Sequence, residues 1–104
     1  MQVQFRGIQA IPVKAYFALS GAALGSECPE TAQQALGLAE RYEAFTGAPG
    51  QIACIRDYQS GSATVFVGLG DAVSPEALRR GTDKLVAWAN RQKIAQLGIA
   101  ADGL

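Results

Sequence analysis

The fold is decided by residues 64–93, which read TVFVGLGDAVSPEALRRGTDKLVAWANRQK. Thr64–Leu69 is rich in β-branched and aromatic residues without alternation, which predicts a strand buried on both faces. Ser74 and Pro75 are a favourable N-cap and first residue of a helix, although Ala77 leaves the capping box incomplete. Apolar residues at three- and four-residue steps then predict one buried helix face that ends near Lys93: Leu78, Thr82, Leu85, Trp88 and Ala89.

A second strand precedes this unit. Ile52, Cys54 and Ile55 indicate a strand over Gln51–Arg56. The polar segment that separates it from Thr64, residues 57–62, is short, and a short connection favours an antiparallel hairpin.

The first half of the chain predicts a helix with strands before it. The helix should run from Pro29 to Phe45 and stop at Gly47–Gly50, with a stripe of Ala32, Ala35, Leu36, Ala39 and Tyr42. Val13–Leu19 and the alternating Gln2–Phe5 read as strands, the latter half-buried, and Gly21–Cys28 reads as a loop. Ile94–Leu104 reads as the start of a last strand, which suggests a piece of a longer protein.

This order of elements predicts an α/β domain, in which a mixed β-sheet of about five strands is flanked by two helices in two or three layers. We expect the strand–helix–strand units at both ends to give parallel pairing with right-handed crossovers. The length of 104 residues corresponds to one domain, residues 1–104.

Composition excludes several classes of partner. Nine basic residues balance nine acidic ones, which makes nucleic acid an unlikely partner, because such binders need a basic excess. No secretory signal and no apolar run long enough to span a membrane is visible. A cytoplasmic location with reduced thiols is therefore the expectation. The chain has no histidine, the commonest transition-metal ligand and general base, which lowers the expectation of an active site.

Gly68-Leu69-Gly70 lies between a strand and a helix, where a dinucleotide-binding loop would lie. The third glycine of that fingerprint is missing because its position holds Val73, and Asp71 would repel a pyrophosphate. A tight turn or close packing that needs glycine is the favoured interpretation.

The two cysteines are interpreted as ordinary thiols. Cys28 stands at a predicted helix N-terminus, which lowers a thiol pKa, but Glu27 and Glu30 flank it. Cys54 alternates with Ile52 and is predicted to lie in the core. With no histidine, the pair does not constitute a zinc site.

Asp57 and Asp71 each follow a strand of the predicted hairpin, so they could form a carboxylate pair for metal binding or acid–base work. Solvated strand ends are the favoured interpretation. Trp88 and Tyr42 are expected to pack in the core. No residue is assigned a catalytic, cofactor-binding or metal-binding role.

Residues Phe45 to Gln92 resemble the amino-terminal domain of the leucyl aminopeptidase, or cytosol aminopeptidase, family. The features that match are the turn Gly47–Gly50, the apolar strand Ile52–Ile55, the segment Val67–Gly70 and the helix start Glu76–Gly81. The resemblance implies a macro-domain-like fold at the periphery of a hexamer.

The same resemblance implies that the chemistry lies elsewhere. The family's two divalent metal ions, zinc or manganese, and its N-T-D-A-E-G-R-type motif belong to a carboxy-terminal catalytic domain that this chain does not contain. The chain is then a non-catalytic accessory domain whose partner is that catalytic domain. Two alternatives stay open: a macro-like module for a small ligand or nucleotide, and a stand-alone interaction domain.

Overall fold

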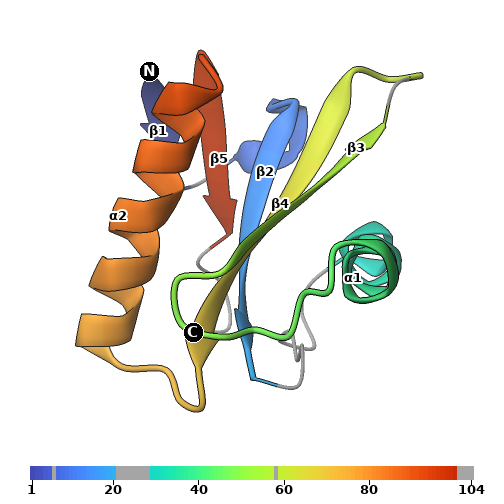
Figure 1. Ribbon diagram of the computed structural model, residues 1–104. Helices are drawn as coiled ribbons and strands as arrows, with labels where there is room; N and C mark the ends of the chain where they lie inside the picture. Colours follow the sequence, from blue (N-terminus) through green and yellow to red (C-terminus); the bar gives the residue numbers. More distant parts are fainter. Residues whose placement is uncertain (6, 21–28, 58, 101–104) are drawn as a thin grey trace.

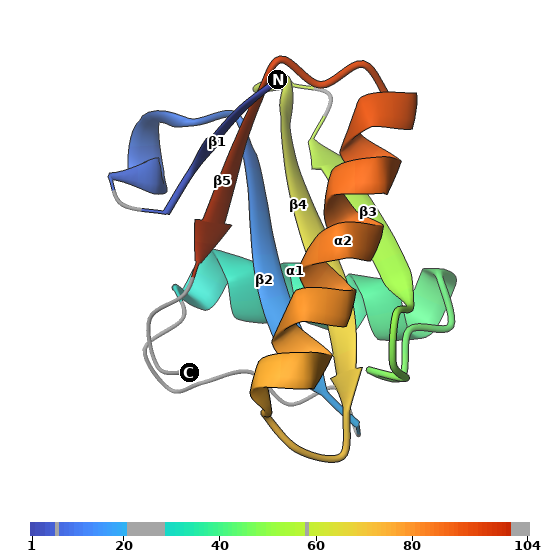
Figure 2. The same ribbon diagram turned by 90° about the vertical axis from the view of Figure 1, so that its left-hand side faces the viewer.

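The computed structural model describes residues 1–5, 7–20, 29–57 and 59–100. It is a three-layer α/β domain, with one five-stranded sheet between two helices that cover opposite faces (Figures 1 and 2). The elements are β1 (Gln2–Gln4), the 3₁₀ turn η1 (Ile8–Ala10), β2 (Val13–Leu19), α1 (Glu30–Tyr42), β3 (Ile52–Asp57), β4 (Ser62–Gly70), α2 (Pro75–Arg91) and β5 (Gln96–Ala100). The predicted fold class, a mixed sheet of five strands with two helices, is confirmed.

The strand order is β1-β5-β2-β4-β3. Neighbouring strands are parallel except for β3 and β4, which form the predicted antiparallel hairpin. The expectation of parallel pairing in both strand–helix–strand units is wrong, because in neither unit are the two strands neighbours in the sheet. β2 and β3 run in opposite directions and do not pair, because β4 lies between them. β4 and β5 are parallel but are separated by β2.

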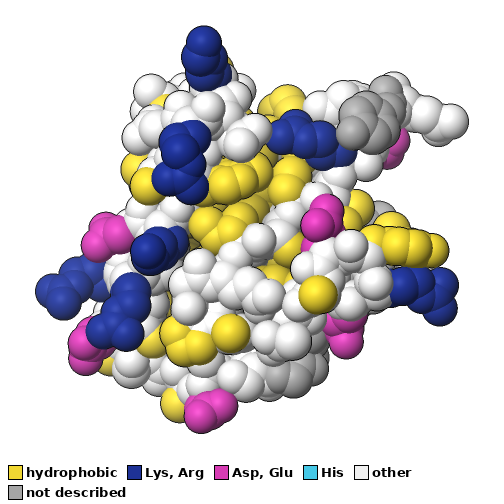
Figure 3. Space-filling model, in the orientation of Figure 1, with side chains coloured by type: hydrophobic (Ala, Val, Ile, Leu, Met, Phe, Trp, Pro, Cys, Tyr) yellow, Lys and Arg dark blue, Asp and Glu magenta, His cyan; other side chains and the backbone are white. Residues whose placement is uncertain are grey.

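The core has two halves, one on each face of the sheet. Phe66, Tyr16 and Phe45 pack under α1, and the ring centroids of Phe45 and Phe66 are 6.0 Å apart. Val65, Val67 and Leu97 pack under Leu85 and Ala89 of α2. On that second face Ile52, Cys54 and Trp88 are only partly buried. Figure 3 shows the apolar surface that results between α2 and β3.

Helix α1 ends at Tyr42, earlier than the predicted Phe45. The N–H groups of Glu43 and Phe45 both donate to the carbonyl oxygen of Ala39, and Ala44 between them adopts φ 53°. The left-handed conformation of Ala44 ends the helix. It turns Phe45 back into the core and leaves Tyr42 70% exposed, so the expectation that Tyr42 is a core residue is wrong.

The first strand is shorter and less covered than predicted. β1 comprises three residues at the edge of the sheet, and Val3 and Phe5 are 36% and 55% exposed. They are therefore not half-buried as the alternating pattern predicted. By contrast, α2 begins where predicted: the Ser74 hydroxyl accepts the N–H of Ala77 at 3.0 Å, and Pro75 is the first helical residue. No described helix could cross a membrane.

Candidate functional site

The Gly68–Gly70 segment is already occupied by the protein's own backbone. The N–H of Gly68 donates to the carbonyl oxygen of Gln51 at 2.8 Å, and the N–H of Gly70 donates to that of Gly47 at 3.0 Å. A phosphate-binding loop needs such N–H groups free to point at the ligand. The segment is therefore a packing element, as the favoured interpretation had it.

The two glycines are required for different reasons. Gly70 has φ +87°, a conformation that side chains disfavour. Gly68 instead lies against the backbone of Gly47 and Ala48, where a Cβ would overlap the Ala48 carbonyl oxygen. Close approach of α2 to the sheet applies to neither of these glycines. It applies to Gly81 of α2, where a Cβ would stand 3.2 Å from side-chain atoms of Leu69 and Val67.

The carboxylate pair considered for Asp57 and Asp71 does not form. Because β3 and β4 are antiparallel, their carboxyl ends lie at opposite ends of the sheet, and Asp57 pairs with Ser62 at the far end of β4 from Asp71. The separation along β4 is on the order of 30 Å at about 3.3 Å per residue. Among the described residues, no three His, Cys, Asp or Glu side chains lie together as metal ligands would.

Cys54 lies at the edge of the core rather than inside it. It is half-buried against the apolar cluster under α2. Burial raises the pKa of its thiol, Arg56 lowers it and Glu43 raises it, and burial dominates. A thiol with a raised pKa is a weak nucleophile at neutral pH. Cys28 lies outside the described residues.

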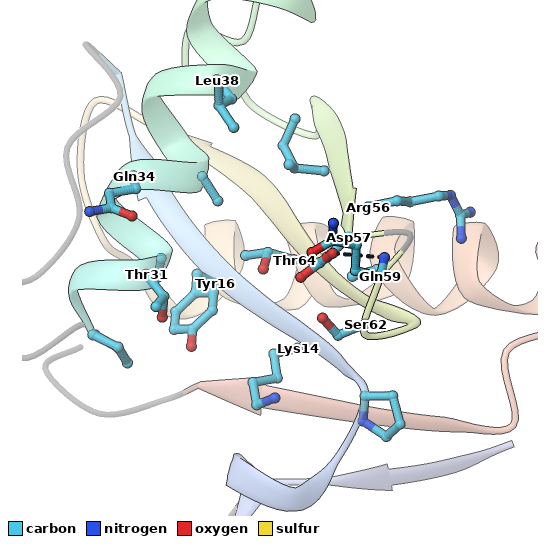
Figure 4. A pocket seen from close by; sticks show the side chains of 16 residues that line it. Lys14, Tyr16, Thr31, Gln34, Leu38, Arg56, Asp57, Gln59, Ser62 and Thr64 are labelled. Atoms are coloured by element: carbon cyan, nitrogen blue, oxygen red, sulfur yellow. Dashed lines mark hydrogen bonds between the residues drawn. The ribbon is translucent and has the colours of Figure 1, made fainter.

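A cleft with a volume of about 670 Å³ lies between α1 and the sheet (Figure 4). Its floor is the α1-facing side of β2, β4 and β3, beyond the part of the sheet that α1 covers. Its wall is the helix. Polar side chains from four segments line it: Lys14, Tyr16, Thr31, Asp57, Ser62 and Thr64.

Strand pairing fixes how these floor residues lie relative to one another. Lys14 of β2 stands beside Thr64 of β4, which stands beside Ile55 of β3. Asp57 and Ser62 form the neighbouring row toward the hairpin tip. The cleft therefore carries one ammonium group on β2 and one carboxylate on β3, with hydroxyl groups between them.

Lys14 has no carboxylate partner, since the only ion pair between described residues joins Glu76 and Arg80 of α2. Its half-buried side chain donates to the carbonyl oxygen of Ile11 at 2.7 Å, which takes one of three ammonium hydrogens. Arg56 is among the lining residues, but its side chain extends away from the cleft, and its guanidinium donates to Gln92 on the other side of the sheet at 3.4 Å.

Asp57 is held at the start of the β3–β4 turn. Its Oδ1 accepts the N–H groups of Gln59 at 3.0 Å and Ser60 at 3.4 Å. Hydrogen bonds from the Ser60 hydroxyl and from these two N–H groups lower the pKa of the Asp57 carboxyl. The carboxylate is therefore ionised and fixed in orientation at neutral pH.

Sequence reasoning missed this cleft. Its one early sign is Lys14, a charged residue inside the otherwise apolar strand VKAYFAL. Nothing in the sequence placed Lys14 next to the β3–β4 turn, because that proximity depends on β2 pairing with β4. The cleft also lies at the amino ends of β2 and β4, whereas ligands of open parallel sheets usually bind at the carboxyl ends.

Comparison with known proteins identifies a fold and no family. No family model and no curated protein matches the chain. A structure of the bottromycin maturation enzyme BotP aligns with a TM-score of 0.53 and 21% identity, over 75% of this chain and 15% of that one. A structure of BotP in complex with Mn aligns with a TM-score of 0.63 and 22% identity, over 90% and 19%. The chain thus spans less than a fifth of the length of the BotP chains, and identities this low show the fold alone.

Proposed function

We propose that this chain is the non-catalytic amino-terminal domain of a leucyl-aminopeptidase-type metallopeptidase, and that it serves assembly or positioning. The observation that carries the proposal is the ordered resemblance over Phe45–Gln92. A similar fold occurs as a small part of BotP, a bottromycin maturation enzyme.

Under this proposal, the parent protein removes amino-terminal residues from peptides in the cytoplasm as a homo-oligomer. Two divalent metal ions, zinc or manganese, bind in its catalytic domain. No metal, substrate or catalytic role is assigned to a residue of this chain.

The apolar surface between α2 and β3 is the proposed contact with the catalytic domain. Ile52, Cys54 and Trp88 are partly exposed there, and exposed apolar surface of this kind marks interaction sites. Trp88 is the only tryptophan of the chain, so its fluorescence reports on this surface alone. If a catalytic domain covers the surface, Trp88 emission should shift to shorter wavelength when the two are mixed.

The deciding experiment is to read the coding sequence downstream of Leu104. A following domain with the N-T-D-A-E-G-R-type motif supports the proposal, and that domain expressed separately supplies the partner for the Trp88 measurement. A stop codon, or an unrelated domain, favours the stand-alone interaction domain instead.

An activity assay gives an independent test. The purified chain should release no leucine from a leucyl peptide, with or without manganese or zinc, because its described residues contain no cluster of His, Cys, Asp or Glu side chains that could hold catalytic metal ions. Release at a rate proportional to the amount of chain would contradict the proposal.

A further inference from the structure

The α1-side cleft contains two opposite charges that do not neutralise each other. Lys14 and Asp57 both line it, on β2 and β3, with β4 between them. They form no ion pair, as the only one between described residues is Glu76–Arg80. Each is oriented by the backbone, Lys14 through the Ile11 carbonyl and Asp57 through the N–H groups of the turn.

The register sets the spacing of the two strand positions that carry these charges. Two strand spacings of about 4.8 Å separate β2 from β3, and Asp57 is one row, or about 6.6 Å, further along than Lys14. Their Cα atoms are therefore roughly 12 Å apart. A free amino acid carries its ammonium and carboxylate groups on one carbon and spans little of this distance. Each peptide unit adds about 3.8 Å between successive Cα atoms, so a chain of two or three residues spans more of it.

We propose that this cleft binds short peptides of two or three residues with both ends free. The terminal carboxylate accepts hydrogen bonds from Lys14, and the terminal ammonium donates to Asp57. This proposal does not depend on the function proposed above, since it rests on the charges and register of this chain alone.

The remaining lining residues suit such a ligand. The Thr64 and Ser62 hydroxyl groups lie between the charges and can donate to or accept from a peptide unit. Ile55 and Leu38 provide apolar lining for a side chain of the ligand. A nucleotide fits less well. Among the described residues, Lys14 is the one cation whose charged group is directed to this cleft, and the Asp57 carboxylate would repel the phosphate groups.

The test is an NMR titration of the chain with the dipeptide leucyl-alanine. Backbone amide shifts should move at Lys14, Ser62, Thr64 and around Asp57, with saturation in the millimolar range. Free leucine, which spans less of the distance between the two residues, and the same dipeptide acetylated at its amino end or amidated at its carboxyl end are the matched controls. Blocking one end should weaken binding about two- to fivefold, the size expected of an exposed ion pair.

Variants assign each end of the ligand to its residue. In Asp57→Asn, acetylation of the dipeptide should no longer weaken binding. In Lys14→Gln, amidation of the dipeptide should no longer weaken binding. This is the result that a double-mutant cycle requires of two groups that interact. Asp83→Asn and Lys84→Gln on the exposed side of α2 are the control substitutions. They should leave unchanged the affinities for the free dipeptide, for free leucine and for the acetylated and amidated dipeptides.

Three results would overturn the proposal. The first is the absence of shifts at tens of millimolar dipeptide, and the second is shifts that map outside the cleft. The third is a free dipeptide that binds no more tightly than free leucine or than the dipeptide blocked at both ends. The comparison of free and blocked peptides needs only the unmodified chain, so it decides the matter even if a variant fails to fold.

Discussion

Gly68 lies so close to Ala48 that the Ala48 carbonyl oxygen occupies the space a Cβ on Gly68 would need. The contact joins the strand that forms the centre of the core to the turn that follows α1. It is closed by backbone hydrogen bonds on both sides, from Gly68 to Gln51 and from Gly50 to Gly68. The segment that resembles a nucleotide loop in sequence is thus a backbone junction between two parts of the fold.

Gly68→Ala should destabilise the chain by about 3 kcal/mol or more, because backbone rather than a flexible side chain has to move. Gly70→Ala should cost about 1–3 kcal/mol, through its φ of +87° and the contact with Pro49 Cγ at 2.8 Å. Thermal unfolding measures both as a fall in melting temperature of roughly 4–8 °C per kcal/mol. Gly37→Ala, in an exposed position of α1 with nothing within 4 Å, is the control and should stabilise by up to about 1 kcal/mol.

Lys93→Gly should stabilise the chain by up to about 1 kcal/mol. Lys93 follows α2 with φ 58°, and the N–H of Ile94 donates back to the Ala89 carbonyl oxygen, so the helix ends in a motif that favours glycine. Urea unfolding measures the difference. Lys84→Gly inside α2 should instead destabilise by about 1 kcal/mol. Equal losses in the two variants would show that the Lys93 conformation is not strained.

The Asp57 carboxyl should titrate below its ordinary pKa of 3.8, because hydrogen bonds in the turn favour the charged form. A group with a depressed folded-state pKa adds stability above its unfolded pKa and loses it as the pH falls through the folded value. The stabilisation should therefore be complete at neutral pH and disappear below about pH 4. In Asp57→Asn, which keeps an oxygen acceptor but does not titrate, this pH dependence should be absent. A carboxyl ¹³C titration midpoint at or above 3.8 would refute the expectation.

Cys54 should react slowly with a disulfide reagent in the native state. Burial raises the pKa of its thiol above the ordinary 9.0, and the thiolate is the reactive form. In Cys28→Ser, Cys54 is the only cysteine, so the measured rate belongs to it. The rate should keep rising beyond pH 9 and should increase about tenfold or more in denaturant. Equal rates in native and denatured chain would mean that the thiol is not shielded.

Millimolar NAD or ADP-ribose should leave the melting temperature unchanged. The N–H groups of Gly68 and Gly70 that a phosphate would need already donate to Gln51 and Gly47. A ligand at 100 times its Kd would stabilise the fold by about 2.7 kcal/mol, which thermal unfolding readily detects. A rise in melting temperature that grows with ligand concentration would instead support the macro-like alternative.

The sequence alone was sufficient for the identity and order of the five strands and two α-helices, but not for the 3₁₀ turn η1. Ser74 and Pro75 start α2 through contacts within a single turn, and the short polar segment after β3 permits only a hairpin. Such signals are local, since the groups that interact are a few residues apart. For the same reason the position of Gly68–Gly70 at the end of a strand was predictable, and so was its architectural role.

Tertiary structure alone decided which strands are neighbours and, through them, where the side chains lie. Pairing of β2 with β4 brings Lys14 within reach of the β3–β4 turn, although Lys14 and Asp57 are far apart in the chain. Antiparallel pairing of β3 with β4 separates Asp57 from Asp71, and the turn after α1 exposes Tyr42 by placing Phe45 in the core. From local periodicity one can predict that a residue packs against an apolar neighbour, but not which strand or helix provides that neighbour. That choice depends on burial and backbone pairing summed over the whole sheet.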